Sequence, residues 1–308
     1  MITVWLPSPK RLQRIGVWPE LASLLARGDR LADAAEGLPA LVAQSFALTP
    51  NRLSEAALSR LADCGDAAHG NWLRADPVSL GADQSSLRLM AFNGLNLDHA
   101  AAEDLAAVLK PLFGDIGYEL SVVTPERWYL RLADGSEIPE FSPPERVLGD
   151  RLDAHLPTGT SGLRWQRLLT EAQMSLHAHR LNQRRMQHGQ MPINSLWFWG
   201  GGRLPNRVQT TVARVHSADP VLQGLSRHAA RAFHADLAEA LQAPRTAHDL
   251  FDLRAAFADP GLRATLLSAL QSWLQSNVPV QIAFESGERL LVKPWHRIRF
   301  WRKPLDWT

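Results

Sequence analysis

The stretch from Leu163 to Pro205, LRWQRLLTEAQMSLHAHRLNQRRMQHGQMPINSLWFWGGGRLP, determines the fold expected for the chain around it. Its first half repeats apolar residues at intervals of three and four, which predicts a long helix with one inward side: Trp165, Leu168, Leu169, Ala172 and Leu176. Gly189 and Pro192 predict the end of this helix, because glycine accepts the left-handed C-terminal conformation and proline cannot continue the ladder. Residues 195–199 predict a short aromatic strand that runs into a Gly-Gly-Gly turn.

The same stretch carries charge of one sign. Between Ala172 and Ala218 the sequence has no Asp or Glu. It has several arginines there: Arg180, Arg184, Arg185, Arg203, Arg207 and Arg214. An uncompensated cationic segment beside a glycine turn predicts binding of an anion.

Composition sets wider limits. The 308 residues, 45% hydrophobic and 21% charged, are typical of a folded protein with one large or two ordinary domains. The formal net charge of +2 does not by itself indicate a nucleic-acid partner. The single cysteine, Cys64, excludes an internal disulfide and favours a reducing compartment. The sequence shows no secretory signal pattern and no apolar run of about 18 residues, so we expect a cytoplasmic protein without a membrane partner.

Element patterns change near residues 70 and 205. Residues 2–6 predict a buried strand, and the segment from about 70 to 205 predicts strands, a helix, a strand pair, the long helix and a last strand, which is an α+β pattern. After Pro205 we expect a strand at 211–216, helices at 219–241 and 261–274, and a hairpin between 278 and 292.

The middle of the chain resembles a known family. The residues that carry the resemblance keep the family's spacing: Gly70 to Asp76, His179, Asn182, Arg185, Gly189, Pro192, Asn194, Gly200 and Gly202. In this pattern the segment resembles the inserted domain of the archaeal-type, cofactor-independent phosphoglycerate mutases. Over nearly its full length the chain is also similar to bacterial proteins called phosphoglycerate mutase or RpfE-type regulatory protein, through residues 72–77 (WLRADP) and 194–202 (NSLWFWGGG).

The resemblance implies an α/β fold of the alkaline-phosphatase-like class, in which Asp and His ligands hold two divalent metals and a Ser accepts the phosphoryl group. This sequence departs from that pattern, because it has no Asp-Gly after its first strand and its C-terminal acids and histidines are scattered. Trp199 also stands where the family has Arg, and Gln190 where it has Lys. We therefore expect a degenerate, shortened and catalytically empty outer α/β domain (1–67 and 206–308) around an inserted α+β domain (68–205). We expect no catalytic residue, metal or cofactor.

The ligand-binding residues implied by the resemblance lie in the inserted domain. They are Arg74, Asp76, His179, Asn182, Arg185, Asn194, Trp199, Gly200, Gly201 and Gly202. A guanidinium fork suits a phosphate or carboxylate, so we expect Arg74 and Arg185 to meet at one cavity. Structural alternatives stay open for three of these residues: Arg185 bonding the last helix carbonyls, Asp76 serving a turn or N-cap, and Trp199 packing in the core rather than stacking on a base.

Residues 289–303 are both basic and aromatic and contain no acid. Their cations are Arg289, Lys293, Arg297, Arg299, Arg302 and Lys303, interspersed with Trp295, Ile298, Phe300 and Trp301. Single-stranded nucleic acid binds grooves of this composition, with charge on the backbone and rings on the bases. Arg297 and Arg299, alternating with Ile298 and Phe300, also predict a charged edge strand with one solvated face, and we favour that alternative.

Three functions remain open on the sequence alone. The first, which we favour, is a non-catalytic, regulatory binder of a small anionic metabolite, phosphorylated or carboxylated. The second is an active, metal-dependent phosphoglycerate mutase. The third is a nucleic-acid-binding regulator that uses residues 289–303, whose affinity would fall steeply with salt. The sequence does not identify a protein partner.

Overall fold

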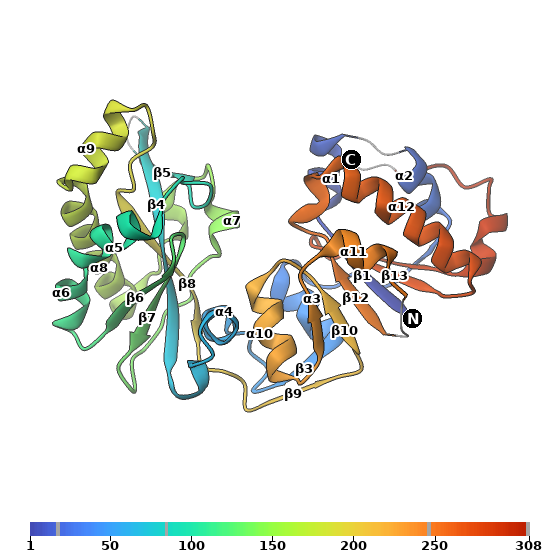
Figure 1. Ribbon diagram of the computed structural model, residues 1–308, viewed down its shortest axis with the longest axis horizontal. Helices are drawn as coiled ribbons and strands as arrows, with labels where there is room; N and C mark the ends of the chain where they lie inside the picture. The colour runs from blue at the N-terminus through green and yellow to red at the C-terminus, as the bar shows by residue number, and fades with distance from the viewer. Residues whose placement is uncertain (17–18, 84–85, 245–247, 306–308) are drawn as a thin grey trace. The chain divides into compact units, whose positions relative to one another are not determined.

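The computed structural model describes residues 1–16, 19–83, 86–244 and 248–305. The chain forms two compact units, which are described separately (Figure 1). Unit 1 contains Met1–Arg52 and Pro205–Thr308, and unit 2 contains Leu53–Leu204. Both units combine helices and sheet, so the fold is mixed α/β.

A seven-stranded sheet forms the centre of unit 1, in the order β11-β10-β12-β1-β13-β14-β2. Its strands are β1 (Ile2–Leu6), β2 (Asp29–Arg30), β10 (Arg214–His216), β11 (Ala232–His234), β12 (Asp249–Asp252), β13 (Val280–Phe284) and β14 (Arg289–Val292). The first five in the order are parallel, and β14 runs antiparallel to both of its neighbours, β13 and β2. Residues 2–6 are apolar except for Thr3, as expected for a strand covered on both faces.

Helices make the crossover connections that parallel strands require. Those of unit 1 are α1 (Pro9–Ile15), α2 (Pro19–Ala26), α3 (Leu38–Ser45), α10 (Pro220–His228), α11 (Leu237–Gln242) and α12 (Pro260–Gln275), with 3-10 turns η3 (Ala256–Ala258) and η4 (Pro294–Ile298). Asp219 and Asp259 begin α10 and α12 as N-caps directly before proline, which favours the first helical turn. A separate ribbon pairs β3 (Phe46–Thr49) with β9 (Arg207–Thr210).

Several predicted elements of unit 1 are confirmed, and one is wrong. The strand at 2–6 and the hairpin between 278 and 292 occur where the sequence predicts them. The single helix predicted over 219–241 is two helices with β11 between them. Ala230 has a positive φ of 51°, which ends α10 and turns the chain back into the sheet.

An antiparallel sheet forms the centre of unit 2, in the order β5-β4-β7-β6 with β8 also paired to β4. Its strands are β4 (Asn71–Asp83), β5 (Ser86–Ala91), β6 (Glu119–Thr124), β7 (Arg127–Leu132) and β8 (Ser195–Gly202). Its helices are α4 (Glu55–Asp63), α5 (His99–Ala107), α6 (Lys110–Gly114), α7 (Pro144–Val147), α8 (Gly159–His177) and α9 (Arg180–Gln187), with η1 (Ala67–His69) and η2 (Leu152–His155). Trp165 stacks on Tyr118 and meets Phe198 edge-on in the core.

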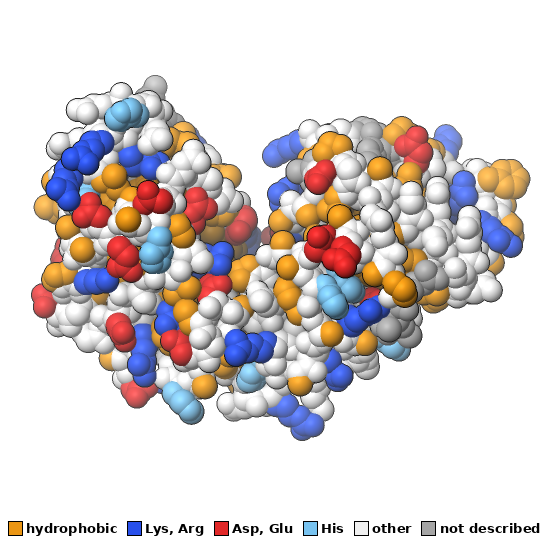
Figure 2. All heavy atoms as spheres, in the orientation of Figure 1, with side chains coloured by type: hydrophobic (Ala, Val, Ile, Leu, Met, Phe, Trp, Pro, Cys, Tyr) orange, Lys and Arg blue, Asp and Glu red, His pale blue; other side chains and the backbone are white. Residues whose placement is uncertain are grey.

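The long helix predicted from residue 163 to 189 is interrupted. It is built as α8 and α9, and His179 between them is the N-cap of α9, its Nδ1 accepting from the Leu181 N–H at 3.3 Å. The side chain thus supplies an acceptor for one N–H at the start of α9. In Figure 2, Lys and Arg side chains group where Figure 1 places α9.

The boundary between the units differs from the one expected at residue 67. Helix α4 belongs to unit 2, because Ala56, Ala57 and Leu61 share a buried cluster with Trp72 and Tyr129 of its sheet. Strand β4 runs from 71 to 83 and includes Asp76 and Pro77. Within the residues that the structure describes, no helix has the length and apolarity needed to span a membrane.

Candidate functional site

Arg74, Asp76 and Trp199 form one buried polar group in unit 2. Arg74 Nε donates to Asp76 Oδ1 at 3.0 Å and its Nη2 donates to Oδ2 at 2.8 Å. The indole of Trp199, on the neighbouring strand β8, donates to the same Oδ2 at 2.7 Å, and the backbone N–H of Trp128 donates to Oδ1 at 3.2 Å. The Arg74 guanidinium lies 4.9 Å from the centroid of the Trp199 ring. The carboxylate therefore occupies the position an anionic ligand would take.

Burial governs the electrostatics of this group. It raises the pKa of the Asp76 carboxyl, and the Arg74 guanidinium opposes that rise. Arg74 Nη1 also donates to Ser59 Oγ at 3.4 Å. Asp76 is thus a strand residue that completes an ion pair, and the turn or N-cap role considered for it is wrong. Arg74 has its fork filled by the protein itself.

Asn182 and Arg185 of α9 are bonded to backbone. Asn182 Nδ2 donates to the carbonyls of Leu176 and Ile193, both at 2.8 Å, and its Oδ1 accepts from the Ile193 N–H at 2.7 Å. Arg185 Nε donates to the Met191 carbonyl at 2.9 Å, and its other nitrogens donate to two more carbonyls, those of Leu95 and Asn96. Burial lowers the pKa of Arg185.

Asn194, the residue before β8, is also bonded to backbone. Its Oδ1 accepts from the Leu80 N–H at 2.7 Å, and its Nδ2 donates to the Leu80 carbonyl at 2.8 Å, which imitates a strand partner for β4. Together with Asn182 it fastens the connection between α9 and β8 from both ends. The side-chain bonds of these two asparagines therefore hold this connection in place.

The three glycines lie within strand β8, so the turn predicted for them is wrong, and they face neighbouring protein. A Cβ on Gly201 would lie 2.8 Å from Ile138 Cγ2 and 2.9 Å from Leu73 Cδ1. A Cβ on Gly202 would lie 2.9 Å from Ser54 Oγ, and one on Gly200, whose φ is +67°, would lie 3.0 Å from Glu55 Cβ. Their role in the structure is to let β8 pass close to α4 and to the 138 region.

The structure thus brings the predicted residues together in two places instead of one. Arg74, Asp76 and Trp199 form the first group. Asn182 and Arg185 form the second, around the segment that Asn194 fastens. His179 belongs to neither, since it caps α9. Arg74 and Arg185 are expected from the sequence to meet at one cavity, but in the structure each guanidinium is bonded to protein oxygens of its own.

A second polar cluster, in unit 1, was not predicted as a site. It lies where the parallel strands β10 and β12 end, the edge at which open α/β sheets bind ligands. Arg254 Nε and Nη2 donate to the two carboxylate oxygens of Asp252 at 2.8 and 2.9 Å, and Nη2 also donates to Asp219 Oδ2 at 2.9 Å. Ser217 Oγ donates to Asp252 Oδ2 at 2.9 Å. The sequence feature that could have indicated this cluster is position: Ser217 follows β10, and Asp252 ends the neighbouring strand β12.

The charged groups of this cluster pair with one another. Burial lowers the pKa of Arg254, the two aspartates raise it, and the net shift is upward. Burial raises the pKa of Asp219, and Arg254 opposes that rise. Trp5, whose ring centroid lies 5.9 Å from the Arg254 guanidinium, has a buried indole N–H without a hydrogen-bond partner in the described part of the chain.

The metal chemistry implied by the resemblance can be tested on these residues. Over residues 1–16, 19–83, 86–244 and 248–305, no three His, Cys, Asp or Glu side chains gather in a way that could hold a metal ion. A two-metal site needs several such ligands that are free to coordinate. Here Asp219 and Asp252 are occupied by Arg254, so the residues do not fit that centre.

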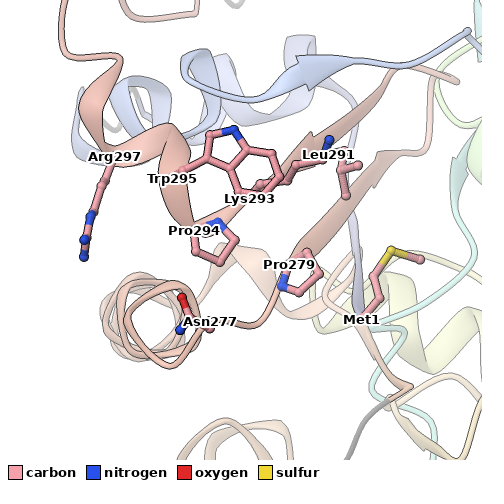
Figure 3. Close-up of a pocket in the computed structure, with 8 residues that line it drawn as sticks. All are labelled: Met1, Asn277, Pro279, Leu291, Lys293, Pro294, Trp295 and Arg297. Carbon is pink, nitrogen blue, oxygen red and sulfur yellow. The ribbon is translucent and has the colours of Figure 1, made fainter.

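The basic aromatic segment borders a cavity of about 490 Å³ in unit 1 (Figure 3). Its lining residues are Met1, Asn277, Pro279, Leu291, Lys293, Pro294, Trp295 and Arg297. The edge strand favoured for residues 297–300 is wrong, because the chain leaves the sheet after Val292 and turns into η4. Proline at the start of η4 has no N–H to offer a strand ladder.

Comparison with known proteins connects the chain to one group of enzymes. It is 28% identical over 169 residues to the 2,3-bisphosphoglycerate-independent phosphoglycerate mutase of Methanosarcina mazei, covering 49% of this chain and 42% of that protein. It is 24% identical over 132 residues to the probable enzyme of the same name from Geobacter sulfurreducens, covering 43% and 33%. The chain spans less than half the length of these relatives. In the matched segments it is a distant homologue of the archaeal-type, cofactor-independent phosphoglycerate mutases.

Two solved structures and a family search complete the comparison. The cofactor-independent phosphoglycerate mutase from Thermoplasma acidophilum aligns with a TM-score of 0.41 at 17% identity, over 95% of this chain and 89% of that one. The PH0037 protein from Pyrococcus horikoshii aligns with a TM-score of 0.47 at 11% identity, over 95% and 87%. No protein-family model matches the chain.

Proposed function

We propose that this chain is a non-catalytic relative of the cofactor-independent phosphoglycerate mutases that binds a small anionic metabolite and serves a regulatory role. The observation that supports this most is the pairing of Arg254 with both Asp219 and Asp252. The pair lies at the ligand-binding edge of the parallel sheet. A guanidinium stays protonated at any ordinary pH, so it neutralises these acids permanently.

A metal would have to displace Arg254 to reach the two carboxylates. Its side chain is 11% exposed and bonds Asp252 through two nitrogens, an arrangement that a hydrated divalent ion does not replace without leaving the guanidinium buried and unpaired. The relatives named above are phosphoglycerate mutases, so a phosphorylated carboxylic acid is the ligand class to test first.

The anion would bind where cations remain available. Arg74 and Arg185 are excluded, because their donors are used by Asp76 and by backbone carbonyls. The cavity beside Trp295 offers Lys293 and Arg297 instead. The regulatory role is part of this proposal, and it requires only binding.

Three measurements on the purified chain test the proposal. Metal analysis should find no stoichiometric divalent ion, and a coupled mutase assay should show no turnover with or without added Mn²⁺, Mg²⁺ or Zn²⁺. Titration calorimetry with 2- and 3-phosphoglycerate, glycerate and inorganic phosphate should give heat of binding for at least one anion. Metal-dependent turnover would instead establish an active mutase, and absence of heat with every anion would refute the binding role.

A further inference from the structure

The cavity of unit 1 has the composition of a small-molecule site. Its volume of about 490 Å³ falls within the range of roughly 300–1,000 Å³ that small ligands occupy. Most of its lining is apolar, from Met1, Pro279, Leu291, Pro294 and Trp295. Three polar side chains join them: Asn277, Lys293 and Arg297. Apolar walls with a few polar groups are what fixes the orientation of a bound small molecule.

Trp295 provides a flat surface at this cavity. Its side chain is 56% exposed, although tryptophan buries more apolar area than any other residue when it is packed. Figure 3 shows its indole above the rings of Pro294 and Pro279, with Asn277 on the opposite side of the opening. An exposed indole beside two proline rings leaves space for another planar ring to stack.

The charge around the cavity is positive. Among the described residues that line it none is acidic. The Arg297 side chain has no hydrogen-bond or ion-pair partner in the part of the chain that is described, since only its carbonyl is bonded, by Arg27. Lys293 Nζ lies 3.5 Å from Asp29 Oδ2 and 4.9 Å from the Trp295 ring centroid. Asp29 is already paired with Arg299 at 2.7 Å, so Lys293 retains charge for a second anion.

Other cations of the segment hold this wall in place. Arg299 donates to Asp29 and to the Arg27 carbonyl, and Arg302 donates to the carbonyls of Ala26 and Gly28. These bonds fix η4 against the end of α2 and β2. Because the wall is ordered before a ligand arrives, binding loses less conformational entropy.

We propose that this cavity binds a planar aromatic ring that carries a phosphate, the chemistry of a nucleotide. The ring stacks on Trp295, the phosphate pairs with Arg297, and the Asn277 amide is placed to bond a ring edge. The Lys293 amine, which Figure 3 shows on the opposite side of the indole from Arg297, adds positive potential to the cavity. The inference rests on the anion-binding role proposed above and names the ligand class and site for it. A free nucleotide and the end of a single strand share this chemistry.

Titration calorimetry on the full chain tests the ring and the phosphate separately. Adenosine 5′-monophosphate should bind, while ribose 5-phosphate, which lacks the ring, and adenosine, which lacks the phosphate, should each bind at least about tenfold more weakly. A six-nucleotide single strand distinguishes the two sources. Binding of the strand more tightly than the mononucleotide, with a steeper salt dependence, identifies a strand end as the natural ligand.

Matched variants locate the site. Trp295→Ala should weaken mononucleotide binding about tenfold and Trp295→Phe should restore most of it, because a ring is kept. Trp301→Ala is the control, since Trp301 is 66% exposed and does not line the cavity. Arg297→Gln should weaken the mononucleotide about tenfold and leave adenosine unchanged, whereas Lys303→Gln, outside the cavity, should change neither.

Two results would overturn the inference. The first is equal affinity for the mononucleotide and ribose 5-phosphate, and the second is equal effects of Trp295→Ala and Trp301→Ala on mononucleotide binding. Heat with phosphoglycerates but none with the mononucleotide would refute the nucleotide site and leave the proposed function standing. Absence of heat with every anion refutes both.

Discussion

Arg254 binds Asp252 through two hydrogen bonds: Nε donates to Oδ1 at 2.8 Å, and Nη2 donates to Oδ2 at 2.9 Å. Asp252 is the last residue of β12, next to β1 in the parallel part of the sheet. A single side chain therefore sets the charge at the edge where this class of sheet binds its ligands. The same guanidinium reaches Asp219, so one cation serves two acids.

Removing that cation should destabilise unit 1 strongly. Arg254→Ala leaves the carboxylates of Asp219 and Asp252 without their cation, and we expect a loss of about 3–5 kcal/mol in the free energy of unfolding. Urea denaturation followed by circular dichroism measures it. The matched control is Arg203→Ala, because Arg203 pairs with Asp134 on the surface, where the side chains are 54% and 93% exposed. That change should cost at most about 1 kcal/mol. Equal effects of the two variants would contradict a structural role for Arg254.

The asparagine that fastens β8 gives a second prediction, in unit 2. Asn194→Ala leaves the N–H and the carbonyl of Leu80 without their partners, so we expect a loss of about 1–3 kcal/mol. Asn51→Ala, at an exposed position, should stay within about 0.5 kcal/mol of the wild type. Calorimetric affinity for any anion should be the same in both variants. A change in affinity confined to Asn194→Ala would return this residue to the ligand site.

The sequence predicts the elements of this chain better than it predicts the use of their polar residues. Helix and strand periodicity depends on neighbours in the sequence, so β1 and the β13–β14 hairpin are found from the sequence alone. The partners of Arg185 lie in a distant loop, at Leu95 and Asn96. A guanidinium that bonds carbonyls and one that binds phosphate can occupy the same helical position, and spacing does not tell them apart.

The corrections share this cause. Arg299 and Arg302 look solvated in the sequence because their acceptors, Asp29 and the carbonyls of Ala26 and Gly28, belong to the other end of the chain. The cluster around Arg254 escapes detection for a related reason. Its members come from β10, β12 and the loops that follow, and only the order of strands in the sheet brings them together.

A glycine of strand β8 gives a third prediction. In Gly201→Ala the new methyl would lie 2.8 Å from Ile138 and 2.9 Å from Leu73, and we expect this overpacking to cost about 1–3 kcal/mol. Gly114→Ala is the control, because Gly114 ends helix α6 with open space around it. Its unfolding free energy should be unchanged or higher by up to about 1 kcal/mol. Thermal denaturation measures the unfolding free energy of both variants. A Gly201→Ala variant as stable as the wild type would mean that this part of β8 is loosely packed.

His216 should make unit 1 sensitive to acid. The imidazole lies between His234 and Phe251, with ring centroids 5.1 and 4.4 Å away. Burial lowers its pKa to about 4; the nearby Asp249 carboxylate opposes this, and His234 and Arg214 add to it. The unfolded chain takes up this proton near the ordinary pKa of about 6.5, and the folded chain does not. The contribution of His216 to the free energy of unfolding is therefore fully present above that pH. It then falls as the pH decreases and levels off below about 4.

The slope between these limits identifies the residue. One proton bound only by the unfolded chain lowers the unfolding free energy by at most about 1.4 kcal/mol per pH unit. His216→Phe keeps the stacked ring and removes the titration, so urea unfolding between pH 7 and 5 should show a flatter dependence than in the wild type. His99→Asn, on the surface, should retain the wild-type slope. Parallel profiles for His216→Phe and the wild type would mean that His216 takes up its proton equally in the folded and unfolded chain.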